Sequence, residues 1–409
     1  MDLDAPTAEV LERCEALARL SEEPGRLTRT FLRPPVRDVH ERLTAWMREA
    51  GLTVRTDAIG NMIGRRPGQR EDAGVFIVGS HIDTVPDAGK YDGVLGVLLG
   101  IAAAKALAGQ QFRRSLDVIA FSEEEGVRFR TPYLGSRAVC GRFDADLLAL
   151  EDADGVSLAH AVLDFGLDST RLPEAAYRRG EVAGYFEAHI EQGPLLESAG
   201  RAVGVVKAIV GTSRLSVRFT GRSGHAGTLP MRQRRDALAA AAEFVVTVER
   251  YARASETLRA TVGQLVVVPG AINVVPGEAR LTLDVRGPQD SVRERAVNHF
   301  RQRAEEIAEE RGLTVVIDSL GDHPAVALDK ALTNRLSNAV CAGGHAPVVM
   351  DSGAGHDAAI MAGLCPATML FLRSPGGISH HPDESVLPED VRTALGVMVR
   401  FLQSELSAE

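Results

Sequence analysis

Residues 80–96 read SHIDTVPDAGKYDGVLG and lie between two apolar runs, GVFIVG at 74–79 and VLGVLLGIAAA at 94–104. The apolar runs predict a buried strand followed by a buried helix. The segment between them carries one His, three Asp and one Lys. Such side chains are costly beside a core unless something pairs with them. A metal ion is the candidate partner, and the rest of the chain must then supply its other ligands.

Strands and helices alternate along the first half of the chain. Apolar spacing and turn residues predict helices at 7–22, 36–50 and 94–109, a hairpin at 52–68, and strands at 74–81, 115–125 and 183–193. This alternation indicates an α/β domain with a mixed, largely parallel sheet. The site of such a sheet usually lies beyond the carboxyl ends of its strands.

The pattern changes after about residue 207. Alternating strands and long amphipathic helices follow in the order β-α-β-β-α-β, the split βαβ arrangement. We therefore predict an inserted α+β domain at 211–324, with the catalytic domain formed by residues 1–210 and 325–409.

Composition limits the classes of partner and compartment. The 409 residues are 45% hydrophobic and carry a formal charge of −9, from 46 Lys and Arg against 55 Asp and Glu. Without a strongly basic patch, we expect no nucleic-acid partner, and no apolar run reaches the roughly 18 residues of a membrane span. The four cysteines are far apart, and the acidic N-terminus lacks a secretory pattern. These features predict a cytoplasmic protein.

Several His and acid clusters fall at successive predicted strand ends. They are His81 with Asp83, Glu124 with Glu125, and His189. Asp92 lies just before the predicted helix, and the pair His380–His381 in GISHHPDE lies near the C-terminus. Imidazole and carboxylate ligands together suit zinc, and also manganese, cobalt or nickel. Each cluster alone has an ordinary interpretation, because a strand-end His is usually capped or exposed and a run of Glu is usually solvated. Their coincidence along one sheet favours a metal site.

A family resemblance rests on seven motifs that occur in one order along nearly the whole chain. They are GSHIDTVPDAGKYDG, FSEEEGVRF, EAHIEQGPLLE, GHAGTLPMRQRRDA, INVVPGEARLTLDVR, DSGAGHDA and GISHHPDE. The chain resembles the M20-type metallo-amidohydrolases, and most of all their carbamoylase branch. That branch contains N-carbamoyl-L-amino acid hydrolases, β-ureidopropionases and allantoate amidohydrolases. HIEQGP together with HAGTxPM is quite specific to the branch, whereas HxD alone would be weak.

The resemblance implies two divalent metal ions per chain. One ion would be held by His81, Asp92 and His189, and the other by Asp92, Glu125 and His380, with Asp92 bridging. His381 is an alternative to His380, but the SHxPxE register favours His380. Asp83 would orient His81, and Glu124 would be the general base.

The resemblance also implies the substrate contacts. His225 in the inserted domain would donate a hydrogen bond to the tetrahedral oxyanion. Gln192 would bind the ureido end of the substrate, Asn273 and Arg286 its carboxylate, and Gly353 would add a backbone contact. Without the motifs, His225 would be an ordinary surface-loop His and Arg286 an exposed strand Arg. The resemblance further implies a homodimer formed through residues 211–324, which would also act as a lid.

We therefore predict a binuclear metal-dependent hydrolase that cleaves the C–N bond of a ureido compound with a carboxylate, and we favour an N-carbamoyl-L-amino acid as its substrate. Allantoate is the alternative substrate. Allantoate enzymes, as the resemblance implies, carry an Arg where this chain has Ser213, and here Arg214 follows one residue later, which turns the side chain to the other face of a strand. Gln192 and the HAGT loop argue against an aminoacylase or peptidase activity. The presence of every expected metal ligand and of the base Glu124 argues against a catalytically inactive binding protein.

Overall fold

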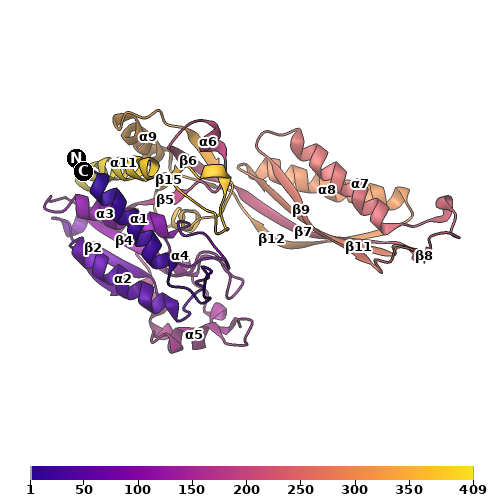
Figure 1. Cartoon of the computed structure of the whole chain (residues 1–409), viewed down its shortest axis with the longest axis horizontal. Helices are drawn as coiled ribbons and strands as arrows, with labels where there is room; N and C mark the ends of the chain where they lie inside the picture. The colour runs from indigo at the N-terminus through magenta and orange to yellow at the C-terminus, as the bar shows by residue number, and fades with distance from the viewer. Residues whose placement is uncertain (1, 409) are drawn as a thin grey trace. The chain divides into compact units, whose positions relative to one another are not determined.

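The computed structural model describes residues 2–408, and the side chains of all of these except residue 71. It divides into two compact units, Met1–Lys207 with Leu328–Glu409, and Ala208–Ala327 (Figure 1). Each unit is built around its own sheet and its own hydrophobic core.

A nine-stranded sheet forms the centre of the first unit. In spatial order its main path is β1 (Thr53–Thr56), β2 (Met62–Arg66), β4 (Ser115–Phe121), β3 (Val75–His81), β5 (Val182–Ile190), β15 (Ala367–Leu372), β6 (Val203–Ile209) and β13 (Val326–Ala327), and β14 (Val349–Ser352) pairs with β6. The four strands β4, β3, β5 and β15 are parallel, whereas β1, β2, β6 and β13 pair antiparallel. The predicted α/β class with a largely parallel central sheet is confirmed.

Helices cover both faces of this sheet. They are α1 (Asp4–Ala18), α2 (Pro35–Glu49), α3 (Val94–Ala106), α4 (Leu134–Val139), α5 (Leu158–Asp164), α6 (Leu195–Ser198), α9 (Lys330–Ala342), α10 (Asp357–Met361) and α11 (Pro388–Ser407). The side chains of β5 alternate between the faces: Phe186 packs on Phe401 of α11, whereas Glu187 accepts a hydrogen bond from the amide of Ala358 in α10.

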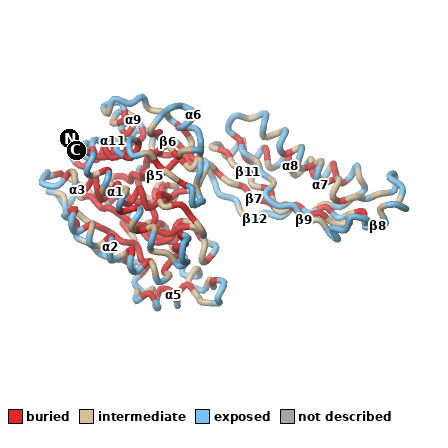
Figure 2. The backbone as a smooth tube through the Cα atoms, viewed as in Figure 1, coloured by how far each residue is buried: buried red, intermediate tan, exposed pale blue. Residues whose placement is uncertain are grey.

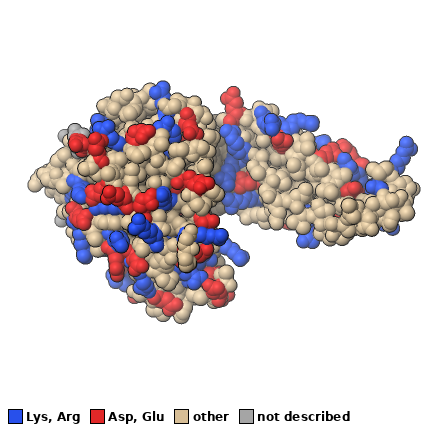
Figure 3. Space-filling view, in the orientation of Figure 1, with Lys and Arg blue, Asp and Glu red and all other residues tan. Residues whose placement is uncertain are grey.

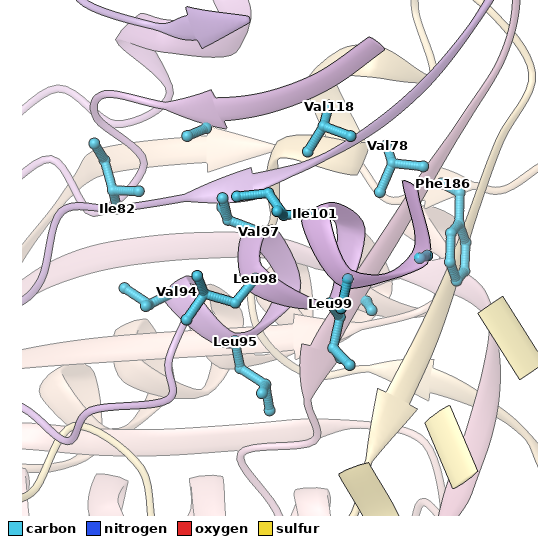
Figure 4. Packing of buried hydrophobic residues seen from close by; sticks show 14 of the residues in the cluster. Val78, Ile82, Val94, Leu95, Val97, Leu98, Leu99, Ile101, Val118 and Phe186 are labelled. Carbon is cyan, nitrogen blue, oxygen red and sulfur yellow. The ribbon is translucent and has the colours of Figure 1, made fainter. Parts of the chain in front are cut away.

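Helix α3 follows directly after the polar segment at 80–93 and anchors it. Residues Val94–Ala104 are all buried, as expected of a helix that is apolar around its whole circumference. Figure 4 shows Val97 and Ile101 of this helix on the side that faces Val78 and Val118 of the sheet, whereas Leu95, Leu98 and Leu99 point away from these strands. Burial of this helix fixes the position at which the polar segment ends.

The second unit is a four-stranded antiparallel sheet with two helices on one face. Its elements are β7 (Gly211–Thr220), β8 (Gly224–His225), α7 (Ala237–Arg253), β9 (Arg259–Val268), β10 (Val274–Val275), β11 (Glu278–Gly287), α8 (Asp290–Glu310) and β12 (Thr314–His323). The sheet order is β12-β7-β11-β9, with β8 and β10 as a separate short pair. Phe219, Phe244 and Phe300 belong to the core of this unit. Along β7, buried residues alternate with half-buried or exposed ones, and the tube in Figure 2 is coloured by this burial.

Charged side chains of both signs are interspersed on the visible face of the first unit (Figure 3). No helix within residues 2–408 has the length and apolar character needed to cross a membrane.

Candidate active site

Polar side chains gather where the parallel strands of the first unit end. His81 is the last residue of β3 and lies opposite Phe121, the last residue of β4. Glu124 follows β4 by three positions, and His189 is the penultimate residue of β5. Because β4, β3 and β5 are parallel neighbours, these ends meet at one edge of the sheet.

Asp83 connects the segments that follow β3 and β4. Its Oδ1 accepts a hydrogen bond from the Glu124 amide at 3.0 Å, and its Oδ2 accepts one from the Glu125 amide at 3.1 Å. In a straight strand, adjacent side chains point to opposite faces. Here the chain bends, and carboxylate oxygens of both Glu residues lie within 4.8 Å of each other and of a nitrogen of His81.

A glycine turn brings Asp92 to the same place. Gly93 has a φ of +66°, and a Cβ at this position would lie 2.5 Å from ring atoms of His81. Only glycine adopts this conformation and close approach without strain. The chain therefore enters α3 with Asp92 against the imidazole of His81.

The two carboxylate oxygens of Asp92 face two different sets of side chains. Oδ1 lies 3.0 Å from Nε2 of His189 and 3.4 Å from Nε2 of His81. Oδ2 lies 3.2 Å from Nε2 of His380, which is itself 3.4 Å from Oε1 of Glu125. Asp92 thus stands between a His–His pair and a His–Glu pair.

The hydrogen bonds of the imidazoles indicate that the ring nitrogens facing Asp92 carry lone pairs. Nδ1 of His81 lies 3.1 Å from the carbonyl oxygen of Asp83, and Nδ1 of His189 lies 2.9 Å from that of Ile190. Neutral imidazoles bonded in this way carry the proton on Nδ1, so their Nε2 lone pairs point at Asp92. Within the described part of the chain, no group donates a hydrogen bond to the buried Oδ1 of Asp92. Converging lone pairs of this kind fit a bound cation.

Three-residue sets with ligand atoms within 4.8 Å of one another are His81–Asp92–His189 and Asp92–Glu125–His380, together with His81–Glu124–Glu125 and Glu187–His189–His356. The first two share only Asp92, through opposite oxygens. They match the donor types of zinc, manganese, cobalt and nickel sites. The residues present therefore fit two ions with one bridging carboxylate.

The acidic side chains raise the pKa values of one another. Burial, together with Glu125 and Asp357, raises the pKa of Glu124 well above its usual range, although His81 opposes this. Burial and the neighbouring Asp92 raise the pKa of Glu125 to about 7. So many buried carboxylates cannot all ionise unless positive charge lies among them.

Gln192 lies beside the second set. It has a φ of +59°, unusual for a residue other than glycine, and Glu191 holds the turn by accepting bonds from the amides of Leu195 and Leu196. Nε2 of Gln192 donates to Oδ2 of Asp92 at 2.8 Å. Its Oε1 is buried and receives no hydrogen bond from the described residues. Gly353 directly follows β14, at the start of the loop that leads to His356.

Sequence reasoning missed three buried residues of this region. Glu187 is two positions before His189 on β5, so both point to the same face, where His356 joins them. Glu384 accepts hydrogen bonds from the amides of Tyr91 and Asp92. All three lie in the quoted motifs EAHIEQGPLLE, DSGAGHDA and GISHHPDE. The spacing of residues in these motifs does not indicate which groups the three side chains contact.

In the second unit, His225 and Asn273 are neighbours. The β8–β10 pair places His225 opposite Val274, and the amide of Ala226 donates to the carbonyl oxygen of Asn273 at 2.9 Å. Nδ1 of His225 accepts from the amides of Gly227 and Thr228 at 3.1 and 3.2 Å. The neutral ring therefore carries its proton on Nε2, where it can be donated.

Arg286 lies near the opposite end of the same sheet. It pairs with Thr212 at the start of β7, whereas β8 and β10 adjoin the end of the sheet formed by Thr220 and Glu278 (Figure 1). Glu278 and Arg286 are eight positions apart on β11, which at roughly 3.3 Å per residue is about 26 Å. The unit does not bring Arg286 together with His225 and Asn273.

Ser213 and Arg214 point to opposite faces of β7. Ser213 is buried on the helix-covered face, where its hydroxyl contacts Asp322 and the guanidinium of Arg293 from α8. Arg214 lies on the other face, with Nε 3.2 Å from Oδ2 of Asp284. Arg214 therefore does not replace an Arg at position 213.

Comparison with known proteins assigns the chain to a family. The model of peptidase family M20/M25/M40 matches residues 77–404. The chain belongs to this family. It is 40% identical to an N-carbamoyl-L-amino acid amidohydrolase of Geobacillus stearothermophilus, over 95% of either chain. It is 37% identical to allantoate deiminase 1 of Glycine max, over 97% of this chain and 89% of the relative.

Comparison with solved structures gives the same result. An amidase of the hydantoinase/carbamoylase family from Burkholderia multivorans superposes with a TM-score of 0.92 at 31% identity, covering 98% of both chains. The family resemblance stated from the motifs is thus confirmed, as is its carbamoylase branch. Members of this M20 branch are amidohydrolases that act on C–N bonds, and the described residues include His and acid sets able to hold metal.

Proposed function

We propose that this M20 protein is a binuclear metal-dependent hydrolase of N-carbamoyl-L-amino acids. The observation that carries the proposal is Asp92, whose two oxygens face separate His and acid sets, with Gln192 bonded beside them. Two curated relatives named for this reaction, at 40% and 37% identity, support the substrate class.

The ligands proposed are those implied by the resemblance: His81, Asp92 and His189 for one ion, and Asp92, Glu125 and His380 for the other. His380, not His381, is the residue beside Asp92 and Glu125, and His381 bonds the amide of Asp383 instead. Two bound divalent ions would polarise the ureido carbonyl and lower the pKa of a nearby water. Zinc, manganese, cobalt and nickel all suit these donors.

Glu124 is proposed as the base that takes a proton from the attacking water and returns it to the leaving nitrogen. Asp83 holds its amide, and so fixes its direction without using its carboxylate. Cleavage of the C–N bond releases the amino acid and a carbamate, which decomposes to ammonia and carbon dioxide.

His225 is proposed as the donor to the oxyanion, because its Nδ1 is occupied by two amides and only Nε2–H remains to donate. Gln192 would bind the terminal NH₂ of the ureido group through its free Oε1. Asn273 and Arg286 are proposed for the substrate carboxylate, with Gly353 as a backbone contact.

The span of the second unit favours a homodimer formed through residues 211–324. About 26 Å separate Arg286 from the end that carries His225 and Asn273, far more than the length of a carbamoyl amino acid. One chain therefore cannot supply all three groups to one substrate by moving this unit as a rigid body. We infer that His225 and Asn273 act on the substrate of the partner chain.

A cytoplasmic location remains a prediction.

Allantoate is the second candidate, since relatives named allantoate deiminase cover nearly the whole chain. The burial of Ser213 against Arg293, with Arg214 on the other face, supports the carbamoyl amino acid instead.

A substrate panel tests the proposal. With Mn²⁺, Zn²⁺, Co²⁺ or Ni²⁺ added to the metal-stripped chain, we expect ammonia release from N-carbamoyl-L-amino acids. Allantoate should react more slowly, and N-acetyl amino acids and dipeptides should not be cleaved. The assay measures ammonia enzymatically and amino acids by chromatography. Faster release from allantoate would favour the second candidate, and cleavage of acetyl or peptide substrates alone would refute both.

A further inference from the structure

A buried carboxylate joins the two loops that meet at Asp92. Glu384 is only 2% exposed. Its Oε1 accepts hydrogen bonds from the amides of Tyr91 at 2.8 Å and Asp92 at 3.1 Å. Its Oε2 accepts one from the hydroxyl of Ser379 at 3.1 Å. Glu384 therefore binds the backbone of the bridging residue and the side chain next to His380.

The surroundings are built closely around this carboxylate. A Cβ on Gly89 would lie 2.3 Å from Cβ and Cδ of Glu384, so the loop before Asp92 packs directly on the Glu384 side chain. His380 has a φ of +56°, a conformation that persists only when its surroundings hold it. The hydrogen bond of Glu384 to Ser379 restrains the residue next to that strained position.

The hydroxyl of Ser379 contacts Oδ2, one of the two carboxylate oxygens of Asp92. This hydroxyl lies 3.0 Å from Oδ2 of Asp92 and 3.3 Å from Nε2 of Gln192. Oδ2 is the oxygen that faces His380, whereas Oδ1 faces His81 and His189. Ser379 thus contacts the Asp92 oxygen that faces His380, and Glu384 holds both Ser379 and the backbone amide of Asp92. The other set is held from β3 and β5, by carbonyl bonds to its imidazoles.

We propose that Glu384 and Ser379 are positioning residues for the second ion, the one assigned to Asp92, Glu125 and His380. Glu384 is not itself a ligand, because its oxygens are occupied by two amides and a hydroxyl. This inference rests on the proposed function, in that it takes both ions as bound. Loss of a hydrogen-bonded partner behind metal ligands typically costs about 10–100-fold in metal affinity.

The test is a titration of the metal-stripped chain with Mn²⁺, monitored by calorimetry to give the affinity of each ion. The metal content per chain after dialysis is the second measurement. Wild type should retain two ions. Glu384→Ala should bind the second ion about 10–100-fold more weakly and retain one after dialysis, with the first unchanged. Glu384→Gln keeps an oxygen for the two amides and should recover part of the second affinity. Asp383→Ala is the matched control, because its side chain is 78% exposed on the same loop.

Ser379→Ala keeps the amide bonds of Glu384 and tests the proposal should Glu384→Ala fail to fold. It should weaken the second ion selectively, without a change in the melting temperature of the metal-free chain. Equal weakening of both ions in the variants would mean a general structural role and would overturn the proposal. So would two ions of unchanged affinity in Glu384→Ala and Ser379→Ala. Fewer than two ions in wild type would instead refute the binuclear function on which the inference rests.

Discussion

Glu124→Gln should retain both metal ions and lose about 10²–10⁴-fold in turnover, the usual contribution of a general base. The amide side chain is nearly isosteric, and the bonds from Asp83 reach the backbone amides of Glu124 and Glu125, so the bend after β4 should persist. The neutral amide cannot take the proton of the attacking water. Turnover of a carbamoyl amino acid and metal content per chain are the two measurements.

Glu389→Gln, an exposed acid in the first turn of α11, is the control and should leave both quantities at wild-type values. Near-normal turnover in Glu124→Gln would remove Glu124 from the role of base. Loss of one ion together with turnover would make Glu124 a ligand, as the set His81–Glu124–Glu125 would allow.

His225→Ala should lose about 10²–10³-fold in turnover, as expected for one oxyanion donor, and its activity should return when it is mixed with Glu124→Gln. In a mixed dimer, the chain with intact Glu124 would receive His225 from its partner. Random exchange makes about half of the dimers mixed, with one complete site in each. Turnover after exchange at matched protein concentration is the measurement.

A second mixture gives the matched control. His225→Ala with Asn273→Ala should recover nothing, because the two residues are neighbours at one end of the second unit and would be supplied to a site together. Proven exchange without recovery in the first mixture would show that His225 acts within its own chain. The inference from the span of β11 would then be wrong.

The sequence predicted the parallel sheet and the gathering of His and acidic residues at its strand ends because both follow local rules. Buried apolar runs specify β3 and α3, and polar residues directly after parallel strands meet at one edge. Glu384 and His356 were missed for a physical reason. His356 bonds Ser352 only four positions away, but it meets Glu187 and His189 from the distant strand β5. The partners of Glu384 are also far away in the sequence, such as the Asp92 amide, 292 positions from it. No spacing in a single sequence reports such a bond.

The separation of His225 from Arg286 was likewise beyond the motifs. They gave both residues one substrate but no distance, and the antiparallel register of β11 was needed to place them at opposite ends of the sheet. The bend that lets Glu124 and Glu125 approach His81 together also depends on a bond across two segments, because both amides donate hydrogen bonds to Asp83, which follows β3.

One carboxylate, that of Asp92, is proposed to hold both metal ions. Metal content per chain, measured by mass spectrometry after dialysis, tests it most directly when wild type is compared with Asp92→Ala. Each oxygen of Asp92 faces a different ligand set, so we expect two ions in wild type and none in Asp92→Ala, with two retained in the exposed control Asp383→Ala. Two ions in Asp92→Ala, or a single ion in wild type, would contradict it.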